Sequence, residues 1–129
     1  MKKKDVLIMA ALGFAVLISS CARLQTPGRV EGGQNIVEMT ASDFKFQPNN
    51  VATRAGESIL FRIQNVTGTS HNFTLKDPKG GTVQSVDIPA KQSVDVRATF
   101  SEPGTYTFYC GKIGHSELGM KGQVVAKGR

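Results

Sequence analysis

The stretch SVDVRATF, residues 93–100, alternates apolar and polar side chains along its whole length. Its apolar members are Val94, Val96, Ala98 and Phe100. Successive side chains of a β-strand point to opposite faces, so this pattern predicts a strand with one face inside and the other in water. The same alternation recurs in Ile59, Phe61 and Ile63, which indicates a second strand of this kind.

Further short segments of the chain also have the composition of strands. They are 35–40, 44–46, 51–54, 71–76, 82–88, 104–110 and 121–126. Turn-forming residues separate them, at 48–50, 55–57, 77–81 and 102–104. Short turns or helical pieces are expected at 43–47 and 116–119, and no long amphipathic helix is predicted. Several short strands separated by turns predict an all-β domain, either an antiparallel sandwich or a barrel.

The start of the chain is predicted to be an export signal, residues 1–20. Lysines at 2–4 give a positive start, and an apolar run without charges follows from 6 to 18. This run is shorter than the ~20 apolar residues that a helix needs to cross a bilayer, so a signal peptide is favoured over a transmembrane helix. A buried helix of the folded domain is the alternative.

The segment Ile18-Ser19-Ser20-Cys21 resembles the bacterial lipobox, in which the cysteine becomes the new N-terminus and carries lipid. Several acyl chains on Cys21 would anchor the protein to a membrane far better than one chain does. Ordinary cleavage nearby, which leaves a soluble periplasmic protein, is the alternative. We expect an exported, membrane-anchored lipoprotein on the periplasmic or outer cell-surface side. The polar, glycine-containing range 21–34 is predicted to be a flexible tether, and 35–129 the folded domain.

The chain carries a formal net charge of +6, part of which comes from the lysines of the export signal. The other basic residues are spread along the sequence and form no basic block or aromatic-interleaved patch. This distribution argues against a nucleic-acid partner. It is compatible with an acidic protein partner or with anionic lipid headgroups.

The segment FYCGKIGHSELGM, residues 108–120, contains a cysteine, a histidine and a methionine at even intervals. These are Cys110, His115 and Met120. The whole chain has two histidines and two cysteines, one of which is the predicted lipid site. The segment therefore gathers side chains that are scarce elsewhere, and the other histidine, His71, begins a predicted strand.

Strand phase indicates that these side chains meet. Cys110 shares a strand face with Phe108, and His71 shares one with Phe73, so both point toward the core at strand ends. Each residue alone is more often structural, because buried cysteines act as small hydrophobes. Together with Met120, two imidazoles, one thiolate and a weak thioether define a type 1 (blue) copper electron-transfer site.

The same residues carry a resemblance to the cupredoxins, the plastocyanin/azurin superfamily of blue copper proteins. The matching segments are DFKFQP (43–48), AGE and SILFRIQN (55–65), HNF (71–73), PGTYTFYC (103–110) and CGKIGHSELGM (110–120). The resemblance implies a Greek-key antiparallel β-sandwich over about 35–126 that holds one copper ion. It implies three ligands in one plane and an axial methionine, in the set His71, Cys110, His115 and Met120. The spacing of the loop is similar to that of the membrane-associated auracyanins.

The resemblance also implies two roles around the ligands. Asn72 is similar to an asparagine whose hydrogen bonds hold the ligand loop near the thiolate; a surface asparagine is the alternative. The residues that flank His115 are similar to an apolar patch on which redox partners dock: Ile113, Gly114, Leu118 and Gly119. Ordinary core positions are the alternative for Ile113 and Leu118.

The expected function is a lipid-anchored, monomeric one-electron carrier, Cu(II)/Cu(I), between redox proteins such as a cytochrome or a copper oxidoreductase. A periplasmic copper carrier or homeostasis protein of the same fold is the alternative. Carriers usually favour exposed methionine- or histidine-rich tracts, and the sequence has none. A metal-free domain that binds a protein partner is a third hypothesis, which the full ligand set argues against.

An enzyme is not expected. A cysteine–histidine hydrolase would need a base and a preorganised oxyanion site, for which the sequence has no signature. A multicopper oxidase or copper nitrite reductase needs further histidines, and the binuclear copper centre of oxidases needs a second cysteine in the loop. Neither is present in this chain.

Overall fold

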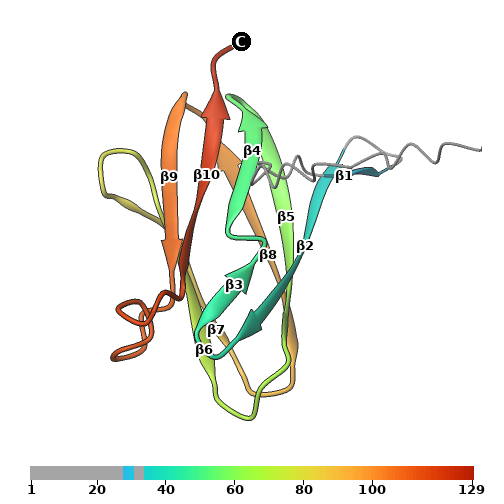
Figure 1. Ribbon diagram of the computed structural model, residues 1–129. Coiled ribbons are helices and arrows are strands. Elements are labelled where there is room, and N and C mark those ends of the chain that lie inside the picture. Colours follow the sequence, from blue (N-terminus) through green and yellow to red (C-terminus); the bar gives the residue numbers. More distant parts are fainter. Residues whose placement is uncertain (1–27, 31–33) are drawn as a thin grey trace, which may run out of the picture.

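Two facing β-sheets make up the part of the protein that the computed structural model describes, residues 28–30 and 34–129 (Figure 1). The strands in these ranges are β1 (Gly28–Val30), β2 (Gln34–Ser42), β3 (Lys45–Gln47), β4 (Asn50–Arg54), β5 (Glu57–Asn65), β6 (His71–Lys76), β7 (Thr82–Ile88), β8 (Ser93–Phe100), β9 (Gly104–Tyr109) and β10 (Lys121–Lys127). None of these residues belongs to a helix long and apolar enough to cross a membrane.

The order of the strands confirms the predicted all-β Greek-key sandwich. One sheet has the order β1-β2-β5-β8, with β3 also paired to β2, and the other has the order β4-β10-β9-β6-β7. Two of the pairs, β2–β5 and β4–β10, are parallel, and the other pairs are antiparallel. A parallel pair needs a crossover connection. The chain makes one between β2 and β5 by sending β4 into the opposite sheet.

The sheet begins earlier in the sequence than predicted. β1 pairs antiparallel with the start of β2, in the register Gly28 opposite Ile36, so strand pairing begins within the range 21–34 that was expected to be a tether. Backbone hydrogen bonds to the free edge of β2 suffice to form a strand in a segment too short to show alternation. The predicted export signal 1–20 and the predicted lipid site Cys21 lie outside the described residues.

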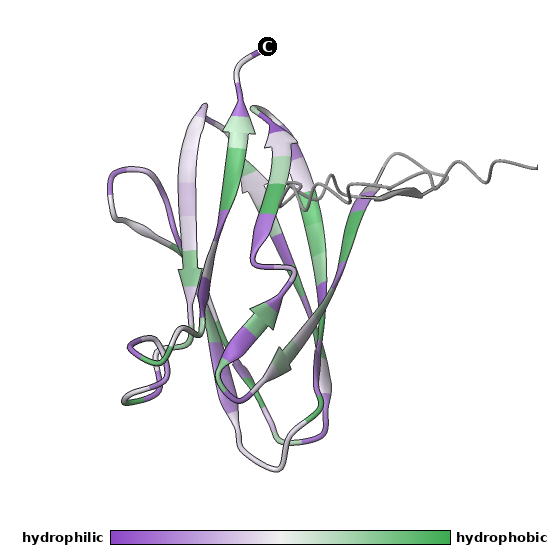
Figure 2. Ribbon diagram, viewed as in Figure 1, coloured by the Kyte–Doolittle hydropathy of each residue, from purple (hydrophilic) through white to green (hydrophobic). Residues whose placement is uncertain are grey.

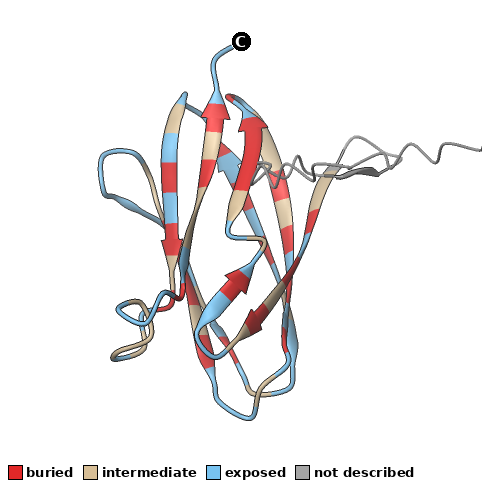
Figure 3. Cartoon of the chain, viewed as in Figure 1, coloured by how far each residue is buried: buried red, intermediate tan, exposed pale blue. Residues whose placement is uncertain are grey.

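Burial follows the predicted alternation along the strands, as hydropathy (Figure 2) and burial (Figure 3) show. In β8, Val96 and Phe100 are buried while Asp95 is exposed. Phenylalanine rings fill the centre: Phe73 and Phe108 stack with ring centroids 5.2 Å apart, and Phe46 contacts both edge-on at 5.7 Å. Each aromatic pair contributes about 0.5–1.5 kcal/mol beyond its buried area.

This aromatic cluster lies directly next to the predicted ligands in the chain. Phe73 follows His71 by two residues, and Phe108 precedes Cys110 by two. β6 and β9 are antiparallel neighbours, with Leu75 opposite Phe108, so the start of β6 and the end of β9 lie at the same end of the sheet. The packed core therefore fixes the positions from which both ligand side chains extend.

Candidate metal centre

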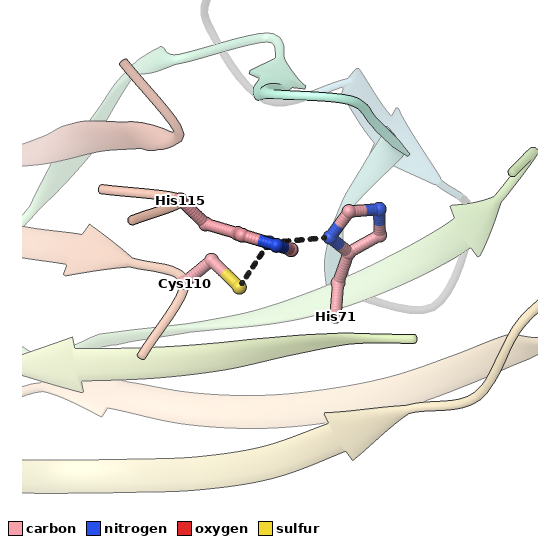
Figure 4. A group of neighbouring side chains, drawn as sticks. All are labelled: His71, Cys110 and His115. Carbon is pink, nitrogen blue, oxygen red and sulfur yellow. Dashed lines mark hydrogen bonds between the residues drawn. The ribbon is translucent and has the colours of Figure 1, made fainter. Parts of the chain in front are cut away.

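Three of the four predicted ligands converge at one end of the sandwich (Figure 4). His71 is the first residue of β6, Cys110 follows the last residue of β9, and His115 lies in the loop between β9 and β10. His71 and Cys110 are fully buried, and His115 is half-buried. In Figure 4 the His115 ring lies between the other two side chains.

The distances between the donor atoms suit a metal ion. His115 Nδ1 lies 3.3 Å from His71 Nδ1 and 3.5 Å from Cys110 Sγ, and the ligand atoms of all three residues lie within 4.8 Å of one another. Bonds of about 2.0–2.3 Å to nitrogen and sulfur, as zinc forms them, place the donors roughly 3.5 Å apart around a three-coordinate ion. Two imidazoles and a thiolate are the donor set that a type 1 copper ion takes.

Met120, the fourth predicted ligand, is fully buried and lies directly before β10. Its carbonyl oxygen accepts a hydrogen bond from the Cys110 amide at 3.0 Å, and its own amide donates to the His115 carbonyl oxygen at 3.0 Å. The turns between these residues contain Gly114 and Gly119, with φ of 80° and 108°, a backbone conformation that glycine adopts at little cost. The loop thus closes on itself, with the methionine backbone bonded to two other predicted ligands.

Asn72 connects β6 to the ligand loop by two hydrogen bonds. Its backbone amide donates to Cys110 Sγ at 3.3 Å, and its side-chain oxygen accepts from the Gly111 amide at 3.3 Å. The same oxygen accepts from the Thr74 hydroxyl at 2.6 Å, which orients the amide side chain. These hydrogen bonds join Asn72 to Cys110 and to the residue that follows it in the loop.

The far side of the His71 ring has two oxygen neighbours that the sequence did not indicate. His71 Nε2 lies 3.1 Å from the hydroxyl oxygen of Thr67 and 3.3 Å from a carboxylate oxygen of Asp43. Burial lowers the pKa of His71 from its ordinary value, while the Asp43 carboxylate opposes this shift and the nearby His115 adds to it. The lowered pKa favours the neutral imidazole, the form that binds a metal.

Three exposed apolar side chains lie on the ligand loop or against it. The ring of Phe44, at the turn between β2 and β3, meets the His115 ring edge-on with centroids 4.9 Å apart. Ile113 is fully exposed and Leu118 is 64% exposed, so the alternative that they are core residues is wrong. The exposed residues Phe44, Ile113 and Leu118 form what we call the apolar rim; the predicted docking residues Gly114 and Gly119 lie in the same loop.

Sequence reasoning missed Asp43, Phe44 and Thr67 because no spacing rule connects them to the ligands. Asp43 and Phe44 were part of the matching segment DFKFQP, but their contacts depend on how the β2–β3 turn lies over β6 and the ligand loop. Thr67 is placed by Asn65, whose side-chain oxygen accepts from both the amide and the hydroxyl of Thr67. Asparagine side chains commonly stabilise turns by accepting from the backbone amide two residues later. The Asn-Val-Thr segment was therefore the one local indication in the sequence of where Thr67 lies.

Comparison with known proteins gives consistent matches. A family model described as the cupredoxin-like domain matches residues 8–126. Plastocyanin of Dryopteris crassirhizoma is 34% identical over 110 residues, which cover 77% of this chain and 99% of that protein. The copper-resistant cuproprotein CopI of Rubrivivax gelatinosus is 27% identical over 118 residues, 78% of this chain and 72% of that one. The solved structure of auracyanin A, a "blue" copper protein of Chloroflexus aurantiacus, superposes with a TM-score of 0.65 at 21% identity, over 74% of this chain and 100% of that one.

Proposed function

The chain belongs to the family of cupredoxin-like domains, and from this premise we propose that it carries single electrons between redox proteins at one type 1 copper ion. The ligands in this proposal are His71, Cys110, His115 and Met120. The observation that carries it is the convergence of two imidazole nitrogens and one thiol sulfur within 4.8 Å at the end of the sandwich. When bound there, copper supplies a one-electron Cu(II)/Cu(I) couple.

The protein's own groups prepare the site for electron transfer. The soft thiolate of Cys110 suits Cu(I), and the imidazoles suit both Cu(I) and Cu(II), so the same ligands can hold the ion in either oxidation state. The amide of Asn72 donates to Cys110 Sγ and so helps to orient the sulfur, and the Asn72 side chain accepts from the amide of Gly111, the next residue of the loop. Burial of His71, Cys110 and Met120 keeps water away from the donors, so little solvent rearranges when the charge changes.

The apolar rim is the proposed docking surface for redox partners, together with Gly114 and Gly119. His115 is the partly exposed member of the ligand set; the ring of Phe44 contacts it, and the exposed side chains of Ile113 and Leu118 belong to the same loop as His115. Exposed apolar side chains gathered at one place mark interaction surfaces. Electrons would therefore enter and leave through the His115 edge, and the protein would turn over no substrate of its own.

Anchoring to a membrane through lipid on Cys21, on the periplasmic or outer cell-surface side, is part of the proposal. The positive residues 2–4, the apolar run 6–18 and the lipobox-like residues 18–21 support it. Mass spectrometry of the protein purified from membranes would test it. Diacylglyceryl and acyl groups on Cys21 are expected, and an unmodified mature protein in the soluble fraction would contradict the anchor.

A copper carrier or homeostasis protein is the second candidate, because CopI, a relative, is described as a copper-resistant cuproprotein. A carrier exchanges metal by stepwise replacement of ligands, which exposed donors allow. Here His71, Cys110 and Met120 are fully buried, which favours a permanently held ion over an exchanged one. Electron transfer is therefore the function that the geometry supports better.

Visible absorption of the purified protein after addition of one equivalent of Cu(II) tests the proposal. An intense thiolate-to-copper band is expected, lost on reduction with ascorbate and restored by an oxidant. A folded protein that remains colourless but binds Cu(I) tightly would support the carrier instead. A folded protein that binds neither ion would contradict both functions.

A further inference from the structure

Two acceptor atoms face the ring nitrogen of His71 that points away from the other ligands. These atoms are Thr67 Oγ1 at 3.1 Å and Asp43 Oδ1 at 3.3 Å from Nε2. An ionised carboxylate accepts hydrogen bonds and donates none, whereas a hydroxyl can donate or accept. The role of the hydroxyl therefore decides how the His71 ring is protonated.

The hydrogen of the Thr67 hydroxyl is already directed elsewhere. Thr67 Oγ1 donates to the side-chain oxygen of Asn65 at 2.8 Å, with the carbonyl oxygen of Thr69 as a second acceptor at 3.1 Å. Asn65 is 1% exposed, and its amide nitrogen donates to the carbonyl oxygen of Ile88, so its orientation is fixed. Thr67 thus presents a lone pair to His71, and both neighbours of Nε2 are acceptors.

With two acceptors at Nε2, the hydrogen of the neutral His71 ring belongs on that nitrogen. Nδ1 then carries the free lone pair, and Nδ1 is the atom that faces His115 at 3.3 Å. Asp43 is 45% exposed, so water solvates its carboxylate while one oxygen stays in contact with a fully buried ring. This arrangement joins a charged acceptor at the surface to an imidazole in the interior.

The same turn contacts the second imidazole. Phe44, the neighbour of Asp43, places its ring against His115 at a centroid distance of 4.9 Å. The turn that joins β2 to β3 therefore touches one ligand of the proposed centre through a hydrogen-bond acceptor and the other through an aromatic edge. Neither Asp43 nor Phe44 belongs to the loop that carries Cys110, His115 and Met120.

We propose that Asp43 is a positioning residue of the metal centre, which holds His71 with its hydrogen on Nε2 and strengthens Nδ1 as an electron-pair donor. A carboxylate that accepts from the far nitrogen of a ligating imidazole fixes the ring and raises its basicity. A more basic imidazole stabilises Cu(II) more than Cu(I), because the ion of higher charge gains more from it. Asp43 therefore lowers the reduction potential. This inference rests on the proposed copper function for its effect on the potential, and on the protein alone for the state of the His71 ring.

The first test compares Asp43→Asn with Asp87→Asn in the copper-loaded protein. Asp87 is an exposed carboxylate opposite Asn72 in β7, paired with Lys112 at 3.7 Å, so its variant removes the same charge near the site without touching an imidazole. Loss of a partner of this kind typically weakens metal binding ~10–100-fold. For Asp43→Asn we expect Cu(II) affinity to fall about tenfold relative to Cu(I), a rise of about 59 mV in potential. The Asp87→Asn shift is expected to be less than about a third of this, because solvent and salt screen an exposed charge.

The thiolate-to-copper band should keep its intensity in Asp43→Asn, since the ligands themselves are unchanged. Equal potential shifts in the two variants would overturn the proposal, because they would show a general effect of charge. Thr67→Val removes the second acceptor and is expected to shift the potential in the same direction as Asp43→Asn. An unchanged potential in Asp43→Asn would also overturn it.

The second test needs no copper and separates this inference from the proposed function. Two-bond ¹⁵N–¹H NMR spectra of the metal-free protein report which nitrogen of each histidine carries the hydrogen. We expect His71 to be protonated at Nε2 in the wild type. A ring protonated at Nδ1 would overturn the proposal, whether or not the protein binds copper. A protein with the expected ring state that forms no copper centre would instead contradict the proposed function while leaving the placement of His71 by Asp43 and Thr67 intact.

Discussion

The two ends of the sandwich both hold clusters of polar side chains, but the clusters are built in opposite ways. At the end where β4 gives way to β5, the carboxylate of Glu57 accepts hydrogen bonds from Thr53 Oγ1 at 3.0 Å, Asn35 Nδ2 at 3.3 Å and the Arg54 amide at 3.3 Å. Hydrogen-bond donors there surround a hydrogen-bond acceptor. The other end instead brings together three atoms that can each donate an electron pair to a metal: a ring nitrogen of His71, a ring nitrogen of His115 and the sulfur of Cys110.

The difference shows which cluster serves stability and which serves function. A matched cluster satisfies its own hydrogen bonds and contributes to folding. A buried cluster of metal-binding atoms adds little to the stability of the metal-free protein, because these atoms have few hydrogen-bond donors among them. A bound cation would satisfy all of them at once. Substitutions at the donor end should therefore change metal chemistry with little loss of stability. Substitutions at the Glu57 end should do the reverse.

Cys110→Ser should have the largest effect. A serine hydroxyl cannot supply the soft thiolate, so the intense visible band should be absent, and we expect Cu(I) binding to weaken at least ~100-fold. The metal-free variant should unfold within about 1 kcal/mol of the wild type, since the buried thiol acts as a small hydrophobe and serine can accept from the Asn72 amide. Absorption spectra and urea titrations measure the two effects. Retention of the intense band would refute the ligand assignment.

Met120→Leu should have the next largest effect. The variant should keep copper and its colour, because three ligands remain, and its reduction potential should rise because a weak donor is lost. A rise on the order of 59 mV corresponds to a tenfold change in the relative affinities for the two oxidation states. Cyclic voltammetry measures it. The matched control is Met39→Leu, the same exchange at a buried position in β2, which should leave the potential unchanged.

Ile113→Ala should alter neither colour nor stability, because the side chain is fully exposed. Its effect should appear in electron exchange between the oxidised and reduced forms of the protein, measured by NMR line broadening. We expect a decrease of about fivefold, the equivalent of roughly 1 kcal/mol of contact energy. Val83→Ala in β7, which also removes exposed apolar surface, is the control and should leave the rate unchanged. Equal rates in all three proteins would exclude Ile113 from the docking surface.

The sequence predicted those features of the fold and the site that depend on the local alternation of side chains along a strand. Alternation in β8 identified Val96 and Phe100 as core residues, and the phase of β9 placed Cys110 inward, because side-chain direction in a strand repeats every two residues. The parallel pairing of β2 with β5 was not predictable in this way, since it depends on which sheet receives β4. The contact of Asp43 with His71 was missed for the same reason: it joins a turn to a distant strand, and no sequence period reports such a meeting.

Glu57→Gln should have the smallest effect and the opposite character. The hydrogen bond from Thr53, followed by those from Arg54 and Asn35, lowers the pKa of Glu57 from its ordinary value of 4.5, so the folded protein favours the charged form. Glutamine keeps the shape of the side chain but loses this charge. We expect the free energy of unfolding to fall by about 1 kcal/mol at pH 7, less than the about 1.5–3 kcal/mol typical of hydrogen bonds to charged groups, because Glu57 is only partly buried.

The pH dependence of this effect follows from the lowered pKa of Glu57. The extra stability of the wild type is complete above the unfolded pKa near 4.5 and is lost as the pH falls through the lower pKa of the folded state. Urea titrations at pH 7 and pH 3 should therefore show a smaller difference between the two proteins at pH 3 than at pH 7, while the copper band and the potential at pH 7 stay the same. A change in potential would mean that the two ends are coupled through the core, and that the division between a stabilising end and a functional end does not hold.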